Sequence, residues 1–330
     1  MKSYPALLIS IVVIIGASYL TPMLNDYILG RIIYIGIMIS LAVSLNLING
    51  FTGQFSLGHA GFMAVGAYTS AVITTYLSTH GFAMSGLTGV FGFLIALVVG
   101  GLLAALAGLG VGIPSLRLRG DYLAIVTLGF NEIIRVILQN VDFTIGGADY
   151  VGGARGMSVL PLTTFTWVFI IAAVTIFCVE NLVNSTYGRG FLAVRDDEIA
   201  AEAMGVDTTK FKVRAFVVGA FFAGMGGGLF AHSNFLITPL DFTFLTSVDI
   251  VVIVILGGMG STIGVVLAAI LLTTLSELLR SVPEFRMIIY SLLLIILMIS
   301  RPQGLFGTNT MDRLLRRWKR EKPLTAPMEG

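Results

Sequence analysis

The sequence predicts an all-α, polytopic helical membrane protein, and two observations carry this prediction. Of the 330 residues, 56% are hydrophobic and only 12% are charged, whereas an ordinary soluble domain has about 25% charged residues. The stretch from Ile32 to Leu116 holds 85 consecutive residues without Asp, Glu, Lys or Arg. A soluble fold with that much uncharged surface would aggregate, so we expect the chain to fold within a bilayer.

About ten membrane segments are expected, some of them possible re-entrant segments, because a helix needs about 20 apolar residues to cross a bilayer. Turn residues divide the apolar runs into segments at 6–21, 28–48, 59–78, 88–112, 121–139, 163–183, 213–232, 246–260, 262–280 and 286–301. All nine prolines fall in predicted loops, tails or helix ends, as expected because an interior proline loses a helical hydrogen bond. The stretches 49–58, 121–139 and 246–260 are also compatible with re-entrant segments.

Small residues predict how the helices pack. Lipid provides no hydrophobic drive for helices to associate, so close packing in a membrane depends on Gly and Ala. In the segment 88–112 these residues recur at every fourth position: Gly92, Ala96, Gly100, Ala104, Gly108 and Gly112. The segment 213–232 repeats the pattern with Ala220, Gly224 and Gly228. We therefore expect these segments to be crossed closely by neighbouring helices.

The distribution of basic residues predicts the orientation. With ten crossings, 15 of the 20 Lys and Arg residues lie on the side that holds both termini and the loop 184–213, and cytoplasmic loops retain positive charge. Both termini are therefore expected in the cytoplasm. Residues 1–306 form the predicted permease domain, with 184–213 as a coupling loop, and 307–330 form a basic cytoplasmic tail that either contacts anionic membrane lipid or is solvated. The glycine-rich external loop 140–162 is either a connector or a contact for a soluble partner.

Several function classes are disfavoured. A net charge of +2 gives no nucleic-acid footprint. The one cysteine, Cys178, provides neither a disulfide framework nor a thiolate metal site, and no His-Glu-x-x-His zinc motif occurs. None of the five lysines follows a glycine, so no phosphate loop for ATP is present. The sequence predicts no catalytic site, metal or cofactor, and energy for transport would have to come from a partner.

The stretch from Gly188 to Asp207 carries the strongest functional signal. Asp196 is expected to cap a helix of about eight residues, because Asp is a favoured N-cap, and Gly205 lies where a left-handed residue ends such a helix. The helix would present an apolar patch of Ile199, Ala200, Ala203 and Met204, beside Glu198 and Glu202 at i, i+4. A short helix of this kind must bind a partner or lie on the bilayer. Two nearby acidic pairs disfavour the anionic membrane surface, so we expect a soluble cytoplasmic protein.

This stretch resembles the coupling loop of permease subunits of ABC importers, in particular the branched-chain amino acid permeases of the LivM type. Four further stretches resemble the same family in the family's order, and together they cover roughly residues 40–306. They are Gly53-Gln-Phe-Ser-Leu-Gly-His-Ala-Gly-Phe62, Leu116-Arg-Leu-Arg-Gly-Asp-Tyr-Leu-Ala-Ile-Val-Thr-Leu-Gly-Phe130, Ile255-Leu-Gly-Gly-Met-Gly-Ser261 and Arg301-Pro-Gln-Gly-Leu-Phe306. The general Glu-Ala-Ala, three residues, Gly motif of importer permeases is only loosely met, because Glu202-Ala203-Met204 runs straight into Gly205.

The resemblance implies a subunit of the bacterial inner membrane that transports leucine, isoleucine and valine. It implies a LivH-like sister permease, two cytoplasmic ATP-binding subunits of the LivG and LivF kind that bind the ATP, and a periplasmic amino-acid-binding protein. It also implies that the loop helix docks on an ATPase, through Arg195, Asp196, Glu198, Ala200, Glu202, Ala203 and Gly205. Near relatives carry urea or short amides, which remain an alternative substrate class.

A polar break between the second and third segments is the second candidate site. It contains Asn46, Asn49, Gln54, Ser56 and His59. Irregular backbone at membrane depth is tolerated only where protein or a water-filled cavity covers it, so a stretch that enters the bilayer here would line the translocation path. The alternative is an ordinary cytoplasmic turn with polar capping residues. The other two histidines, His80 and His232, are expected in loops.

A stand-alone secondary transporter is the remaining alternative. Ion coupling normally needs ionisable residues buried in the membrane, and only Glu132 and Arg135, at i, i+3 within the segment 121–139, fit that description. We expect these two side chains to neutralise each other.

Overall fold

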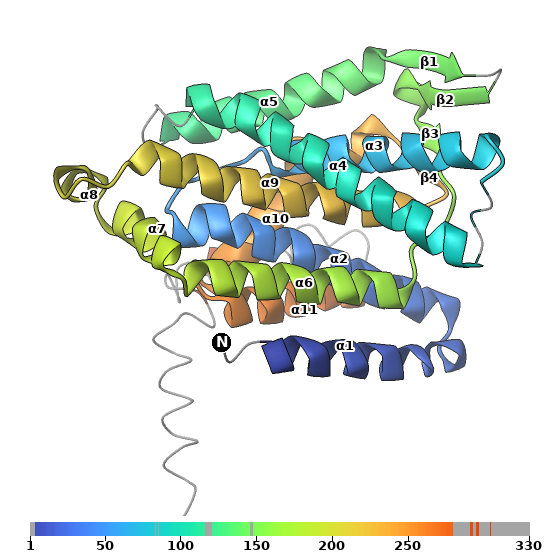
Figure 1. The fold of residues 1–330 in the computed structure, drawn as a ribbon, viewed down its shortest axis with the longest axis horizontal. Coiled ribbons are helices and arrows are strands. Elements are labelled where there is room, and N and C mark those ends of the chain that lie inside the picture. Colours follow the sequence, from blue (N-terminus) through green and yellow to red (C-terminus); the bar gives the residue numbers. More distant parts are fainter. Residues whose placement is uncertain are drawn as a thin grey trace, which may run out of the picture.

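The computed structural model describes residues 4–82, 84, 86–115, 121–145 and 148–279, together with residues 291, 292, 295, 296 and 304. Long helices lie side by side along its long axis, with α7 and α8 at one end and the short strands at the other (Figure 1). The helices are α1 (Tyr4–Ser18), α2 (Asp26–Asn46), α3 (His59–Thr79), α4 (Gly86–Ser115), α5 (Asp121–Asn140), α6 (Phe165–Val183), α7 (Thr186–Asp196), α8 (Glu198–Ala203), α9 (Thr208–Ser233), α10 (Phe244–Gly257) and α11 (Thr262–Leu278).

The predicted helical membrane fold is confirmed. Six helices of the described part are long and apolar enough to cross a membrane, namely α2 with its extension to Phe51, α3, α4, α5, α6 and α9. Shorter apolar helices include residues of α1 and the whole of α10 and α11. The predicted tenth segment, 286–301, and the basic tail, 307–330, lie outside the described ranges apart from four isolated residues of that segment.

The predicted loops contain more structure than expected. The loop 184–213 forms two helices, α7 and α8, and α9 starts at Thr208 rather than at residue 213. At the opposite end, the strands β1 (Asp142–Ile145) and β2 (Ala148–Gly152) pair antiparallel. The strand β3 (Met157–Ser158) pairs with β4 (Leu236–Ile237), which ties the connection before α6 to the one after α9.

Helix α9 lies at the centre of the bundle, against α2, α3 and α4. The expected packing through small residues is confirmed where three of these helices meet. A Cβ atom added at Gly66 of α3 would fall 2.1 Å from the carbonyl oxygen of Gly224 in α9, and one added at Gly100 of α4 would fall 2.9 Å from the carbonyl oxygen of Gly66. Backbones can approach this closely only where the side chain is a hydrogen atom.

The connection between α2 and α3 begins with a helical turn and continues without regular secondary structure. Helix α2 passes into one π-helical turn, Leu47–Phe51, after which Gly53 adopts a positive φ of 68°. Residues 53–58 then lead to α3 without regular secondary structure, and both α2 and α3 pack against α9 (Figure 1). This connection lies at the end of the bundle that carries α7, since Gly53 contacts Arg195.

Candidate functional site

Helix α8 is the short helix that the sequence predicts, but its cap and length differ from the prediction. Asp197, rather than Asp196, is the N-cap, and its carboxylate accepts hydrogen bonds from the backbone N–H groups of Ile199 and Ala200. The helix has six residues, Glu198–Ala203, instead of about eight, and Asp196 is the last residue of α7. Gly205 has the expected positive φ, 83°.

One face of α8 is apolar and exposed. Ile199 and Met204 are 67% and 83% exposed, and Ala200 and Ala203 are exposed beside them. Ala201 points the other way and is buried. The expected patch is therefore present, at an end of the molecule where α8 projects beyond the bundle (Figure 1).

The acidic residues of α8 turn back toward α9. The Lys212 ammonium lies 2.5 Å from the Glu198 carboxylate, and the two side chains are only 7% and 25% exposed. The Thr208 hydroxyl donates a hydrogen bond of 2.8 Å to Glu202. Glu198 and Glu202 therefore attach α8 to the first turns of α9, which the sequence had not indicated.

The start of α9 carries its own cap. Asp207 accepts a hydrogen bond from the backbone N–H of Lys210 and lies 2.8 Å from the Lys210 ammonium. The side-chain hydrogen bond from Lys210 is the largest of the effects that hold the pKa of Asp207 below its ordinary value. Both side chains are well exposed, so this pair contrasts with the buried Lys212–Glu198 pair one turn further along.

The polar break between α2 and α3 is buried within the protein. Its five predicted residues are each at most 5% exposed: Asn46, Asn49, Gln54, Ser56 and His59. Their partners belong to the chain itself. The Asn49 side chain accepts from the backbone N–H of Ser56, and the His59 ring lies 2.9 Å from the Ser44 hydroxyl.

Burial alternates along residues 53–57 of this connection, which is the pattern of an extended chain. Gln54 and Ser56 are buried, whereas Gly53 and Phe55 are exposed and Leu57 is partly exposed. Successive side chains of an extended chain point to opposite sides, so apolar groups form the outer side and polar groups hold the backbone from within. The connection is therefore not an exposed polar turn. That its polar residues line the translocation path stays a prediction.

Several of the buried polar atoms make no hydrogen bond within the described part of the chain. They include Nδ2 of Asn46, Oε1 of Gln54 and Nδ1 of His59. Leaving a buried polar atom unpaired costs about 1–3 kcal/mol. Three of the six such atoms among the described residues belong to this polar break.

Glu132 and Arg135 pair as expected, with Nη2 of Arg135 2.7 Å from the carboxylate. Both side chains are about a quarter to a third exposed. Both residues lie on α5, and each charge is neutralised by the other.

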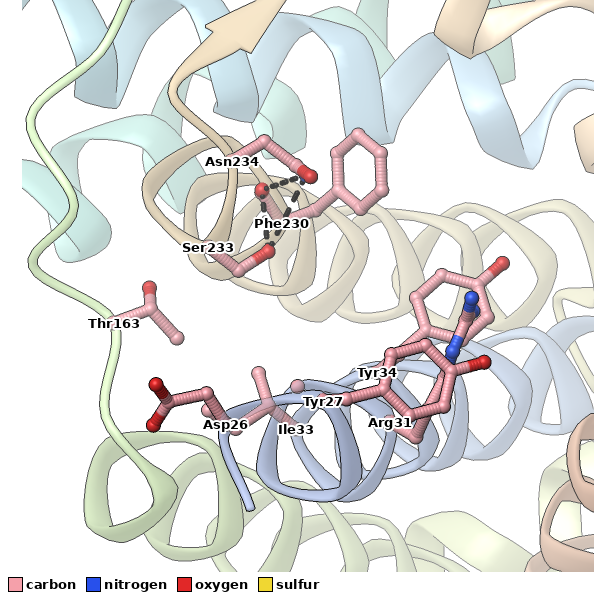
Figure 2. Close-up of a pocket in the computed structure, with 10 residues that line it drawn as sticks. Asp26, Tyr27, Arg31, Ile33, Tyr34, Thr163, Phe230, Ser233 and Asn234 are labelled. Carbon is pink, nitrogen blue, oxygen red and sulfur yellow. Dashed lines mark hydrogen bonds between the residues drawn. The ribbon is translucent and has the colours of Figure 1, made fainter.

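A polar cavity of about 490 Å³ lies at the opposite end of the bundle from α8, between the start of α2 and the end of α9. Figure 2 shows Asp26 and Thr163 on one side of it and Tyr27, Arg31 and Tyr34 on the other, with Ser233 and Asn234 above. Arg31 pairs with Glu277 at 2.8 Å and lies over the Tyr27 ring. No local sequence pattern indicates this cavity, because its residues come from three distant stretches.

His232 was expected in a loop, and this expectation is wrong. It lies in the last turn of α9, fully buried, with its ring 2.9 Å from the Thr74 hydroxyl of α3 and 2.8 Å from the carbonyl oxygen of Gly228. The polar pair thus joins α3 to α9 near the cavity end. His80 follows the last residue of α3, as expected.

The six long apolar helices define the chain as a multi-pass membrane protein. The chain matches the family described as branched-chain amino acid transport system / permease component over residues 26–299. The chain therefore belongs to this family, and its family is one of transport components rather than enzymes.

Individual relatives agree with this assignment. The high-affinity branched-chain amino acid transport system permease protein LivM of Escherichia coli is 36% identical over 304 residues, which cover 82% of this chain and 67% of the relative. A probable LivM permease of Methanocaldococcus jannaschii is 25% identical over 72% of this chain and 77% of its own. The LivH permease of Salmonella typhimurium is 23% identical over 83% of this chain and 92% of its own. The comparison with solved structures gave no significant match.

Proposed function

We propose that this chain is a membrane-spanning subunit of an ATP-driven importer of leucine, isoleucine and valine in a bacterial inner membrane. It would form the translocation path with a LivH-like sister permease and receive substrate from a periplasmic binding protein. ATP would be bound by two cytoplasmic subunits, and the chain itself would need no cofactor. The family membership supports the transport role, and the exposed apolar face of α8 is the observation that supports the coupling.

Helix α8 has the features that a docking element needs. Its exposed face consists of apolar side chains, which lose water favourably when a partner covers them. Its other side is held to α9 by the Lys212–Glu198 pair. A partner that moves α8 would therefore pull on α9, which is the most centrally packed helix of the bundle. The orientation implied by the basic residues puts this end, and both termini, in the cytoplasm.

Transport by the purified complex tests the proposal. The assembled complex is reconstituted in liposomes with its ATP-binding subunits facing the lumen, and the binding protein is added outside. Uptake of radiolabelled leucine is then measured with and without ATP in the lumen. We expect uptake that requires ATP and is not matched by radiolabelled urea. Uptake of urea in place of leucine would reassign the substrate, and uptake driven by an ion gradient without ATP would contradict the importer proposal.

Docking through α8 is tested by substitutions on its exposed face. Ala200→Asp and Ala203→Trp should abolish leucine uptake and reduce the amount of ATP-binding subunit that co-purifies, while the chain remains in the membrane. Thr209→Trp, at an exposed position in the first turn of α9, is the matched control and should transport normally. Normal uptake by the α8 variants would contradict the docking assignment.

A further inference from the structure

Arg195, the residue two positions before the α8 cap, contacts the buried connection directly. A Cβ atom added at Gly53 would lie 3.0 Å from Cγ, 3.3 Å from Cα and 3.5 Å from Cβ of Arg195. The backbone of α7 and the turn at Gly53 therefore touch without any side chain of residue 53 between them. The positive φ of Gly53, 68°, is a second reason why glycine suits this position.

The same arginine reaches a second turn. A Cβ atom added at Gly260, between α10 and α11, would lie 3.1 Å from Nη1 of Arg195. The other two nitrogen atoms of the guanidinium, Nε and Nη2, donate to the Asp196 carboxylate at 3.1 and 3.0 Å. Asp196 thus orients the guanidinium, and Nη1 points toward the turn at Gly260.

The two turns are joined to each other as well. The Asn46 side chain accepts a hydrogen bond of 2.9 Å from the backbone N–H of Gly260. A Cβ atom added at Gly50 would lie 2.3 Å from that same nitrogen and 2.0 Å from the Asn46 oxygen. The ends of α2 and α10 therefore meet through glycine backbones and one buried amide, directly beneath Arg195.

Arg195 is also fixed to the cytoplasmic unit formed by α7, α8 and the first turns of α9. The rings of Phe191 in α7 and Phe211 in α9 pack edge to face, 5.7 Å apart, and Gly190 leaves room for the Phe211 ring. The carboxylate of Asp197, two residues after Arg195, caps α8. A displacement of α8 is thereby passed to Arg195 through a chain of well-packed groups.

We propose that Arg195 is the positioning residue through which the ATPase-docking unit acts on the buried polar connection, by shifting against the turns at Gly53 and Gly260. This inference rests on the proposed function and adds to it the point of contact inside the permease. It assigns Arg195, whose side chain is 37% exposed, to the contact with these two turns instead of to the docking face, which α8 keeps.

A reversible crosslink tests whether this contact must move. The separation of 3.5 Å between a Cβ at Gly53 and that of Arg195 lies at the near end of the range of about 3.5–4.5 Å found in disulfides. In a Cys178→Ser background, the double variant Gly53→Cys, Arg195→Cys should crosslink on oxidation. In the complex in liposomes, we expect oxidation to abolish ATP-driven leucine uptake and reduction to restore the rate measured before oxidation.

The single-cysteine variants are the matched controls, because Gly53→Cys carries the same backbone strain and Arg195→Cys lacks the same guanidinium. Neither should respond to oxidation and reduction. If the crosslinked double variant transported as fast as the same variant with its disulfide reduced, the inference would be overturned. Failure of the unmodified complex to transport leucine with ATP would instead overturn the proposed function, so the two failures are distinguishable.

Arginine substitutions separate the positioning role from a docking role. For Arg195→Ala we expect more ATP hydrolysed per leucine transported, with unchanged co-purification of the ATP-binding subunits, and partial recovery of that ratio in Arg195→Lys. Loss of the ATP-binding subunits from the Arg195→Ala complex would show that the residue belongs to the docking surface, and would contradict the positioning role.

Discussion

The buried ion pair between Lys212 and Glu198 should determine how firmly α8 is held to α9. Replacing Lys212 by Met keeps most of the apolar stem and removes the charge. Breaking a fully buried pair costs about 3–5 kcal/mol, and an exposed pair is worth less than about 1 kcal/mol. Because the two side chains are 7% and 25% exposed, Glu198 regains water when its partner is lost, and we expect a cost of about 1–2 kcal/mol.

Hydrogen exchange of the complex in lipid nanodiscs measures this cost. The amide of Met204 donates to the carbonyl oxygens of Ala200 and Ala201, which closes α8. A loss of about 1–2 kcal/mol raises the population of the open state by a factor of about 5–30, so the peptide 198–206 of Lys212→Met should exchange faster by that factor. We also expect transport to weaken while the rest of the bundle exchanges at its original rate.

The neighbouring pair offers a control of the same residue types. Lys210 and Asp207 lie 2.8 Å apart with 71% and 48% of their side chains exposed. A helical i, i+3 pair contributes about 0.2–0.5 kcal/mol, so Lys210→Met should change exchange in 198–206 by about twofold at most. Equal effects of the two substitutions, or no effect of Lys212→Met, would refute the reasoning that burial gives the Lys212 pair its strength.

Three further predictions concern packing, a buried amide and pH. Gly66→Ala should lower the melting temperature of the purified chain sharply, because the new methyl group meets backbone 2.1 Å away. Gly16→Ala in α1, with open space around it, should not lower that temperature, since Ala is the better helix former. Asn46→Ala removes a buried acceptor and should cost about 1–3 kcal/mol of unfolding free energy, measured against the exposed Asn140→Ala. The lowered pKa of Asp207 means that its contribution to the start of α9 is present above the unfolded pKa and is lost as pH falls through the folded pKa. Protection of the first turn of α9, measured as the exchange rate relative to the intrinsic rate at each pH, should therefore fall in acid, and Asp207→Asn should abolish that dependence.

The sequence predicted the helical segments well where hydropathy alone decides them, and less well where charged residues belong to a helix. The start of α9 was placed at residue 213, because Lys210 and Lys212 look like loop residues by composition. In the structure, Asp207 caps a helix whose charged first turns extend beyond the apolar stretch. Membrane helices end where their caps lie, and hydropathy does not report caps.

Two neighbouring acids explain the misplaced α8 cap. Asp196 and Asp197 are equally good N-caps by type, and only the end of α7 determines that Asp196 is still helical. The capping glycine, Gly205, was predicted correctly because a left-handed position restricts residue type far more strongly.

Long-range contacts of the candidate site could not be predicted from one sequence. The polar residues from Asn46 to His59 are recognisable locally, since polar side chains interrupt an apolar stretch. That Gly53 and Gly260 both touch Arg195 depends on three chain segments meeting in space, and no local pattern encodes that meeting. The pairing of Lys212 with Glu198 is hidden in the same way.

Co-purification tests the central claim most directly. The tagged chain is extracted from its native membrane in mild detergent, and the proteins that accompany it are identified by mass spectrometry. The account predicts a second permease of similar size together with ATP-binding subunits, and loss of the latter in Ala203→Trp. A chain that purifies alone, and that alone catalyses ion-dependent leucine uptake in liposomes, would contradict it and identify a secondary transporter.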